Sequence, residues 1–140
     1  MFRLSQKADY GLILLSNLVL RQAQDKPTPI SQIAKRNKIS AKFLSQVAQD
    51  LKKAGILKAK EGVNGGYSLA KKPQEIKIME VLEVLEGEFF EGRCFREECS
   101  CICGAKGIWR EMKEQIQTTL SAKTVADLVS QVRVSAPKYS

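Results

Sequence analysis

The sequence predicts a mostly α-helical protein with one small β-hairpin, and three stretches carry that prediction. Residues 41–54 place apolar and polar side chains on opposite faces of a helix. Residues 56–69 alternate apolar residues and lysines around a glycine-rich turn, which is typical of a hairpin. Residues 108–120 form a longer amphipathic helix. This order of elements predicts a winged helix-turn-helix, in which the hairpin is the wing, plus a long dimerisation helix.

We expect two regions in the chain. Residues 1–76 should form the winged helix-turn-helix domain, and residues 77–140 should hold a cysteine-containing loop and the dimerisation helices. The charge divides near the same boundary. Residues 1–72 carry 14 Lys and Arg against 4 Asp and Glu (+10), whereas residues 73–140 carry 9 against 11 (−2). A positive excess of this size in one half indicates a polyanionic partner such as nucleic acid.

The first expected helix follows Ser5, a suitable N-cap residue, and runs to about Arg21. Its apolar residues cover more than one face, as in a helix buried between partners, so we expect it to pack on a second subunit. Asp9 lies in the first turn of this helix. On local grounds alone, its carboxylate would simply interact favourably with the helix dipole.

Residues 30–54 predict two short helices joined by a tight turn. The first spans about residues 30–36, and Ser40 caps the second after a turn at Asn37 and Lys38. One face of the second helix is apolar and consists of Leu44, Val47, Ala48, Leu51 and Ala54. The opposite face carries cationic and hydrogen-bonding groups, namely Lys42, Ser45, Gln46, Gln49 and Lys53. A face that reads a DNA groove excludes acids because they repel phosphate, whereas a solvated face usually mixes both signs.

A glycine-rich hairpin follows the second helix. Gly55 ends that helix, and the apolar residues Leu57 and Ala59 then alternate with lysines. Three glycines lie in the turn at residues 62–66. A glycine lets the backbone approach a phosphate or enter a minor groove, although simple turn geometry would also explain glycines here. Beside a polar helix face without acids, the DNA interpretation is favoured.

Three further helices are expected after the hairpin. A short helix at about residues 78–86 ends at Gly87, and the capping box Thr124-x-x-Asp127 opens a last short helix before a tail at residues 134–140. Between them, the long helix has more apolar surface than a helix lying on so small a domain requires. Pairing with a second copy explains this surface, and packing back onto its own domain is the alternative. The predicted dimerisation residues are Ile108, Trp109, Met112, Ile116 and Leu120.

All four cysteines lie between Cys94 and Cys103, with the spacing C-x4-C-x-C-x-C. The N-terminus has no apolar leader segment and the chain has no stretch of transmembrane length, so we expect a cytoplasmic protein. In a reducing cytoplasm, clustered cysteines more often bind a metal or sense redox state than form disulfides. Zinc sites usually contain C-x2-C pairs and often His, and this chain has neither. The spacing favours an iron–sulfur cluster, with a zinc site of four thiolates as the alternative.

Three motifs carry a resemblance to a known family. They are the start Arg3-Leu4-Ser5, the wing Glu61-Gly62-x-x-Gly65-Gly66-Tyr67, and the segment Arg93-Cys94…Cys103-x5-Trp109-Arg110. In this order, over nearly the whole chain, they resemble the IscR/NsrR/RirA superfamily of bacterial transcriptional regulators. The resemblance implies a homodimeric winged-helix regulator whose cysteine loop, at residues 91–106, holds an iron–sulfur cluster near the dimerisation helix.

The resemblance also implies the ligands of the cluster. Cys94 matches the first cysteine of the family and Cys103 the last, while Cys99 fits the middle position better than the extra thiol Cys101. IscR-like members carry a His where this chain has Lys106, and this chain contains no His. NsrR-like members use an Asp early in the first helix, which the other subunit supplies to a 4Fe–4S cluster, and Asp9 occupies that position. The implied ligands are Cys94, Cys99, Cys103 and Asp9, with Cys101 as the alternative to Asp9, and 4Fe–4S is favoured over 2Fe–2S.

The expected function is control of transcription by a cytoplasmic homodimer that binds a roughly palindromic operator in double-stranded DNA and senses iron or cluster status, oxidants or nitric oxide. The expected DNA-binding residues are Lys42, Ser45, Gln46, Gln49, Lys52, Lys53, Lys58, Lys60, Gly62, Asn64 and Gly65. The wing departs from the family at Glu61, where members often carry Arg. An enzyme is not expected, because no nucleophile–base pair is visible without His. The alternatives are a DNA-binding protein with a structural zinc and a small iron–sulfur redox protein.

Overall fold

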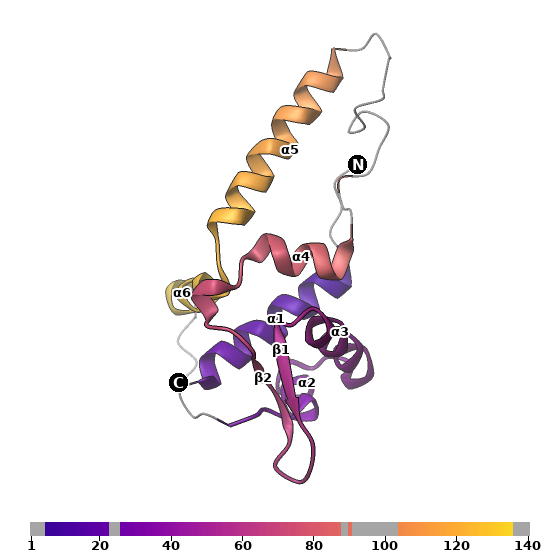
Figure 1. The fold of residues 1–140 in the computed structure, drawn as a ribbon, viewed down its shortest axis with the longest axis vertical. Helices are drawn as coiled ribbons and strands as arrows, with labels where there is room; N and C mark the ends of the chain where they lie inside the picture. The colour runs from indigo at the N-terminus through magenta and orange to yellow at the C-terminus, as the bar shows by residue number, and fades with distance from the viewer. Residues whose placement is uncertain (1–4, 23–25, 88–89, 91–103, 136–140) are drawn as a thin grey trace.

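The computed structural model describes residues 5–22, 26–87, 90 and 104–135, with the backbone alone for residues 131–135. The elements follow the chain as α1 (Gln6–Arg21), α2 (Ile30–Asn37), α3 (Ala41–Lys53), β1 (Leu57–Lys60), β2 (Gly66–Leu69), the short 3₁₀ helix η2 (Pro73–Glu75), α4 (Ile78–Glu86), α5 (Ala105–Ala122) and α6 (Val125–Ser135). The predicted fold, mostly helical with one hairpin, is confirmed. Figure 1 shows α5 extending away from the other elements. Across the described ranges, no helix combines the length and the apolar character needed to span a membrane.

Within the described residues, one hydrophobic core joins both halves of the chain. Its largest fully buried apolar side chains are Leu14, Leu15, Leu44, Val47, Leu51, Ile56, Ile76, Val81 and Val125. Backbone hydrogen bonds reinforce the join, because Val125 N–H donates to Ile76 O at 2.9 Å and Ile78 N–H donates to Lys123 O at 3.0 Å. The helices α4 and α6 therefore share the core of the helix-turn-helix, although the sequence placed them in a separate region.

Helix α1 packs on α3, α4, α6 and β2 of its own chain. Its buried residues are Ala8, Gly11, Leu14, Leu15 and Leu18. A Cβ added at Gly11 would overlap the side chain of Leu85, so glycine at this position allows α1 and α4 to approach closely. These residues are covered within the subunit. Packing of α1 on a second subunit therefore stays a prediction that concerns its remaining exposed surface.

The helix-turn-helix formed by α2 and α3 follows the local signals of the sequence. Ser40 Oγ accepts a hydrogen bond from Phe43 N–H at 3.2 Å and so caps α3. The buried face of α3 consists of Leu44, Val47, Ala48 and Leu51, as predicted. Ala54, predicted on that face, is exposed, because α3 ends at Lys53 and Ala54 is its C-cap residue. Gly55 follows with φ 80°, the left-handed conformation expected after a helix end.

The hairpin is held against the residues before α2 by an isolated β-bridge at Thr28. β1 and β2 pair in antiparallel fashion, with Lys60 opposite Gly66. Thr28 extends this pairing, because its N–H donates to Tyr67 O and its carbonyl accepts from Tyr67 N–H, both at 2.9 Å. A Cβ added at Gly66 would overlap the Thr28 backbone. Gly66, predicted in the turn, therefore belongs to β2 and permits this close approach.

Four helix ends refine the sequence predictions. Ser5 is the N-cap residue of α1, but its hydroxyl donates to Glu86 and caps no helix N–H. The capping box before α6 forms, with Thr124 N–H donating to Asp127 Oδ2 at 2.8 Å. Residues 134 and 135, expected in a tail, belong to α6, and the rest of that expected tail lies outside the described residues. At its start, α5 includes residues 105–106 of the expected loop.

Candidate nucleic-acid interface

The outer face of α3 presents the predicted polar residues to solvent. The exposed members are Lys42, Gln46, Gln49 and Lys53, and Ser45 is half-buried. The buried opposite face fixes the rotation of the helix about its axis, so these side chains point away from the core together. Amide groups and ammonium groups side by side can bind base edges and phosphates, respectively.

Asp50 places a carboxylate beside this face, which the sequence prediction did not consider. Its Oδ2 forms an ion pair of 2.7 Å with Lys7 Nζ on α1. A hollow of about 350 Å³ is lined by Asp50 together with Gln46 and Gln49. The ion pair lowers the negative field of Asp50 near the polar face, and its contribution to stability is small because both partners are partly exposed. The position of Asp50, four residues after Gln46, was the signal in the sequence for its place on this side of α3.

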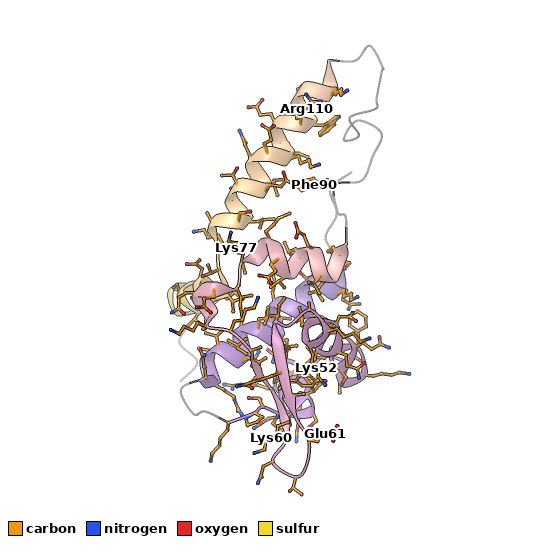
Figure 2. The ribbon with its side chains drawn as sticks, viewed as in Figure 1. Lys52, Lys60, Glu61, Lys77, Phe90 and Arg110 are labelled. Atoms are coloured by element: carbon orange, nitrogen blue, oxygen red, sulfur yellow. The ribbon has the colours of Figure 1, made fainter. Side chains whose placement is uncertain are left out.

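A larger hollow, of about 520 Å³, lies between α3 and the hairpin. Its basic lining comes from Lys52 and Lys53 at the end of α3 and from Lys60 on β1, and Gln49 lines it as well. Figure 2 shows Lys52 and Lys60 toward the same end of the molecule as the hairpin. The fold therefore joins residues of helix and wing into one concave basic surface. Glu61 also lines it, so an acid lies within the surface that would face a polyanion.

The turn of the hairpin projects into solvent. Val63 is 102% exposed, and Gly62 and Asn64 beside it are exposed as well. Gly62 has φ 108°, and a Cβ added at Gly65 would overlap the Lys60 carbonyl. Turn geometry thus explains these two glycines without a partner. Their predicted contact with DNA stays a prediction, for which the exposure of the turn is a necessary condition.

The predicted dimerisation residues divide into two groups along α5. Ile116 and Leu120 pack against the core of their own chain, as the alternative of packing back onto the domain predicts. Ile108 and Trp109 near the start of the helix are 65% and 41% exposed, and Met112 between the groups is half-buried. Figure 1 shows the start of α5 at the far end of the molecule from the hairpin. The exposed apolar surface of α5 is therefore concentrated at its start.

Two contacts involve residues that precede the cysteine segment in the sequence. Before it, Ser5 N–H donates to Glu86 Oε1 at 2.9 Å and joins the start of α1 to the end of α4. Nearer the segment, the buried Phe90 ring lies 5.7 Å from Lys113 Nζ of α5, within the range of a cation–π interaction. These contacts connect Glu86 and Phe90, which precede the cysteines, to the start of α1 and to α5.

Of the predicted metal ligands, Asp9 alone lies within the described residues. Cys94, Cys99, Cys101 and Cys103 lie outside the described residues. Asp9 is exposed in the first turn of α1, one helical turn after Ser5. Within the described ranges, no three potential metal-binding side chains gather together. The ligand set therefore stays a prediction.

The known proteins that resemble this chain over most of its length are transcriptional regulators. The family model Rrf2, described as an iron-dependent transcriptional regulator, matches residues 4–131. The transcriptional regulator NsrR of Shouchella clausii is 37% identical over 132 residues, which cover 91% of this chain and 88% of that protein.

Two solved structures resemble the whole fold. CymR, the global cysteine regulator of Bacillus subtilis, superposes with a TM-score of 0.81 at 30% identity and covers 94% of this chain and 98% of its own. IscR of T. potens superposes with a TM-score of 0.77 at 29% identity and covers 93% of this chain and 88% of its own. The resemblance carried by the three sequence motifs is thus confirmed. The chain belongs to the Rrf2 family of transcriptional regulators, which are DNA-binding proteins and not enzymes.

Proposed function

We propose that this protein is a cytoplasmic homodimer that binds an operator in double-stranded DNA under the control of an iron–sulfur cluster. The observation that carries the DNA-binding part is the concave basic surface shared by α3 and the hairpin. Affinity for DNA comes largely from cations placed against phosphates, whereas specificity needs hydrogen-bonding groups at base edges. This surface offers both kinds of group.

Each part of the surface has a distinct role in this proposal. The residues that face base edges in the major groove are Lys42, Ser45, Gln46 and Gln49. Those that contact phosphates are Lys52, Lys53, Lys58 and Lys60. The exposed turn with Gly62, Asn64 and Gly65 reaches toward the neighbouring minor groove. Glu61 repels phosphate, so the contacts of the wing depend on its lysines.

The exposed start of α5 supports the homodimer. Ile108 and Trp109 would be buried if two α5 helices paired around a two-fold axis. Such an axis also relates two copies of α3, as a roughly palindromic operator requires. The dimer would therefore bury the apolar surface that the subunit leaves exposed, and it would set the distance between the two reading helices.

The chemistry of the predicted ligands suits a cluster. Cys94, Cys99 and Cys103 would supply thiolates, and Asp9 of the partner subunit would supply an oxygen ligand. The Asp9 side chain is exposed and forms no ion pair within the described residues, so its carboxylate can bind an iron ion held by another subunit. When bound, a 4Fe–4S cluster supplies a group that responds to iron supply, oxidants and nitric oxide.

Contacts within the chain provide a physical route from the ligands to the DNA. Asp9 lies one turn from Ser5, which is hydrogen-bonded to Glu86 at the end of α4. The same helix, α1, packs directly on α3. A force on Asp9 would therefore reach α3 through a packed core, which shifts as a unit more readily than it deforms. Shifts of about 1–2 Å at subunit interfaces are typical of such switches.

A cysteine-responsive regulator is the second candidate. The likeness to the global cysteine regulator of Bacillus subtilis favours it. In this case the four cysteines need not hold iron, and the basic surface of α3 and the hairpin would serve DNA binding in the same way.

Anaerobic purification separates the candidates. We expect brown protein with visible absorbance, iron and acid-labile sulfide, and a change in DNA affinity when the cluster is removed. Colourless protein that lacks iron and sulfide yet binds the same DNA would favour the second candidate. Colourless protein with stoichiometric zinc would identify a structural zinc site.

The fourth ligand requires a separate comparison. We expect Asp9→Ala to change the type or stability of the reconstituted cluster and its effect on DNA affinity, whereas Cys101→Ala should leave both unchanged. If Cys101→Ala abolishes the cluster and Asp9→Ala has no effect, the site contains four thiolates and the connection through α1 of the partner subunit is wrong.

A further inference from the structure

A second basic hollow lies on the other side of the hairpin from α3. Its volume is about 400 Å³, and its wall comes from the end of α1, residues 26–28 and both strands. None of the described residues that line this hollow belongs to α3. In Figure 1 the end of α1 and the helix α3 lie on opposite sides of the hairpin. This hollow therefore lies beside the concave surface that we assign to DNA and shares Ala59, Lys60 and Tyr67 with it.

The lining of the hollow is strongly basic. Its four cationic residues are Arg21, Lys26, Lys58 and Lys60. No acid belongs to the described lining, and none of the four cations forms an ion pair within the described ranges. Like charges gathered around one hollow repel one another, and a bound anion would replace that repulsion by attraction.

Hydrogen bonds hold the wall of this hollow in place. Thr28 and Tyr67 join residues 26–28 to β2 through the two backbone hydrogen bonds of 2.9 Å. Arg21 Nη1 donates to Gln32 Oε1 at 3.0 Å, which restrains the guanidinium at the edge of the hollow. The buried side chains of Leu18 and Leu69 add an apolar part to the lining. A concave, partly apolar site with a few convergent polar groups is typical of small-molecule binding.

We propose that this hollow binds a small, multiply charged anion of the phosphate or polycarboxylate class, and that the bound anion lowers the affinity for DNA. Arg21 presents paired N–H donors that match either a phosphate or a carboxylate, and the lysines add point charges. The phosphates of DNA share this chemistry. The concave shape, the apolar lining and the separation from α3 favour a free small ligand over the DNA backbone.

Lys60 connects the hollow to the DNA surface, because it lines both hollows. Lys58, which also lines this hollow, is another of the proposed phosphate contacts. One ammonium group cannot contact the small anion and a DNA phosphate at full strength simultaneously, so the two ligands compete. This competition rests on the proposed DNA-binding function, whereas binding of the anion does not. By linkage, DNA weakens binding of the anion by the same factor, and we expect a factor of about five to ten.

Calorimetric titration of the full chain tests the site directly. Pyrophosphate and citrate serve as separate probes, at constant ionic strength. We expect at least one to bind once per subunit, and Lys26→Gln to weaken it about tenfold. Lys123→Gln, which removes the same charge from an exposed residue outside the hollow, should have no effect. If neither probe binds, or if the two variants weaken binding equally, the site does not exist as proposed.

Fluorescence anisotropy with a duplex selected from a random pool tests the competition. The probe that binds should weaken DNA binding of the unmodified protein about five- to tenfold relative to sodium chloride of equal ionic strength. With Lys26→Gln, the same loss of DNA affinity should require about tenfold more of the probe. If Lys26→Gln alone weakens DNA binding while neither probe binds, the hollow contacts the DNA backbone and the small-ligand proposal is overturned. If a probe binds but no duplex can be selected, the site stands and the DNA-binding function fails.

Discussion

The two ends of this molecule differ in how much of their apolar surface one subunit buries. At the hairpin end, Leu44, Leu51 and Ile56 have no exposed surface. At the opposite end, Ile108 and Trp109 are 65% and 41% exposed, and Figure 2 shows Arg110 of the same turn far from Lys60 and Glu61. The apolar face of α3 is therefore covered within one subunit, whereas Ile108 and Trp109 at the start of α5 keep exposed apolar surface.

This difference indicates where regulation can act. The shape of each proposed DNA-contacting surface is set by a core within one subunit, so it should change little when a partner binds. In the proposed homodimer, the distance between two such surfaces would depend on how the α5 helices pair. Signals are then expected to change the spacing of the reading helices rather than the structure of either one.

Disruption of α5 pairing should have the largest effect. Ile108→Glu leaves the subunit core untouched because Ile108 is exposed there, but in the proposed dimer it would bury an unpaired carboxylate. The cost of about 3–5 kcal/mol should produce monomers in analytical ultracentrifugation and weaken operator binding more than about 100-fold. Thr118→Glu, at an exposed position of the same helix, should remain dimeric. A stable dimer of Ile108→Glu would place the interface elsewhere.

A cavity at the hairpin end should reduce stability without changing the oligomer. Leu51→Ala removes a fully buried side chain between α3 and the core, which should lower the free energy of unfolding by about 2–5 kcal/mol in urea titrations. Val63→Ala in the exposed turn should change it by less than about 0.5 kcal/mol. Equal effects of the two substitutions would contradict the packing of α3 described above.

The polar face of α3 should separate specificity from general affinity. Gln46→Ala should reduce discrimination at one base pair by about 1–3 kcal/mol, because an amide reads a base edge. Lys53→Gln should instead weaken all duplexes alike and lower the slope of log affinity against log salt by about one. Both are measured on duplexes that differ by single base pairs, at several salt concentrations. If Gln46→Ala also weakens all duplexes alike, α3 does not read bases through this residue.

The features predicted well from the sequence are those with local causes. The helix α4 has the predicted bounds of residues 78–86. The signals that predict it, the spacing of its apolar residues and Gly87 at its end, involve residues within about one helical turn of each other. The cap at Ser40 and the left-handed Gly55 likewise depend on neighbours within a few residues. The helix-turn-helix and the hairpin follow from such local signals, and so does the polar face of α3.

The features that the sequence did not predict arise between distant segments. Periodicity shows which face of a helix is buried, but it does not show which remote residue meets the other face. The pairing of Thr28 with Tyr67 and the ion pair of Lys7 with Asp50 are of this kind. The basic hollow behind the hairpin also depends on such placement, because Arg21 lies far in sequence from the lysines of β1.

The smallest predicted effect concerns Ser5 and Ser40, which the sequence analysis predicts as N-cap residues of α1 and α3. Ser40 Oγ accepts from a helix N–H of α3, so Ser40→Ala should lower the free energy of unfolding by about 1 kcal/mol, and Ser40→Asp should restore most of it. Ser5 makes no such bond, and its backbone N–H would still donate to Glu86 in Ser5→Ala. Ser5→Ala should therefore cost less than Ser40→Ala in the same urea titrations, and Ser5→Asp should not stabilise, because it would bring a second carboxylate beside Glu86. If Ser5→Asp stabilises the protein as Ser40→Asp does, Ser5 acts as an ordinary N-cap and the junction of α1 with α4 is weaker than the hydrogen bonds of Ser5 indicate.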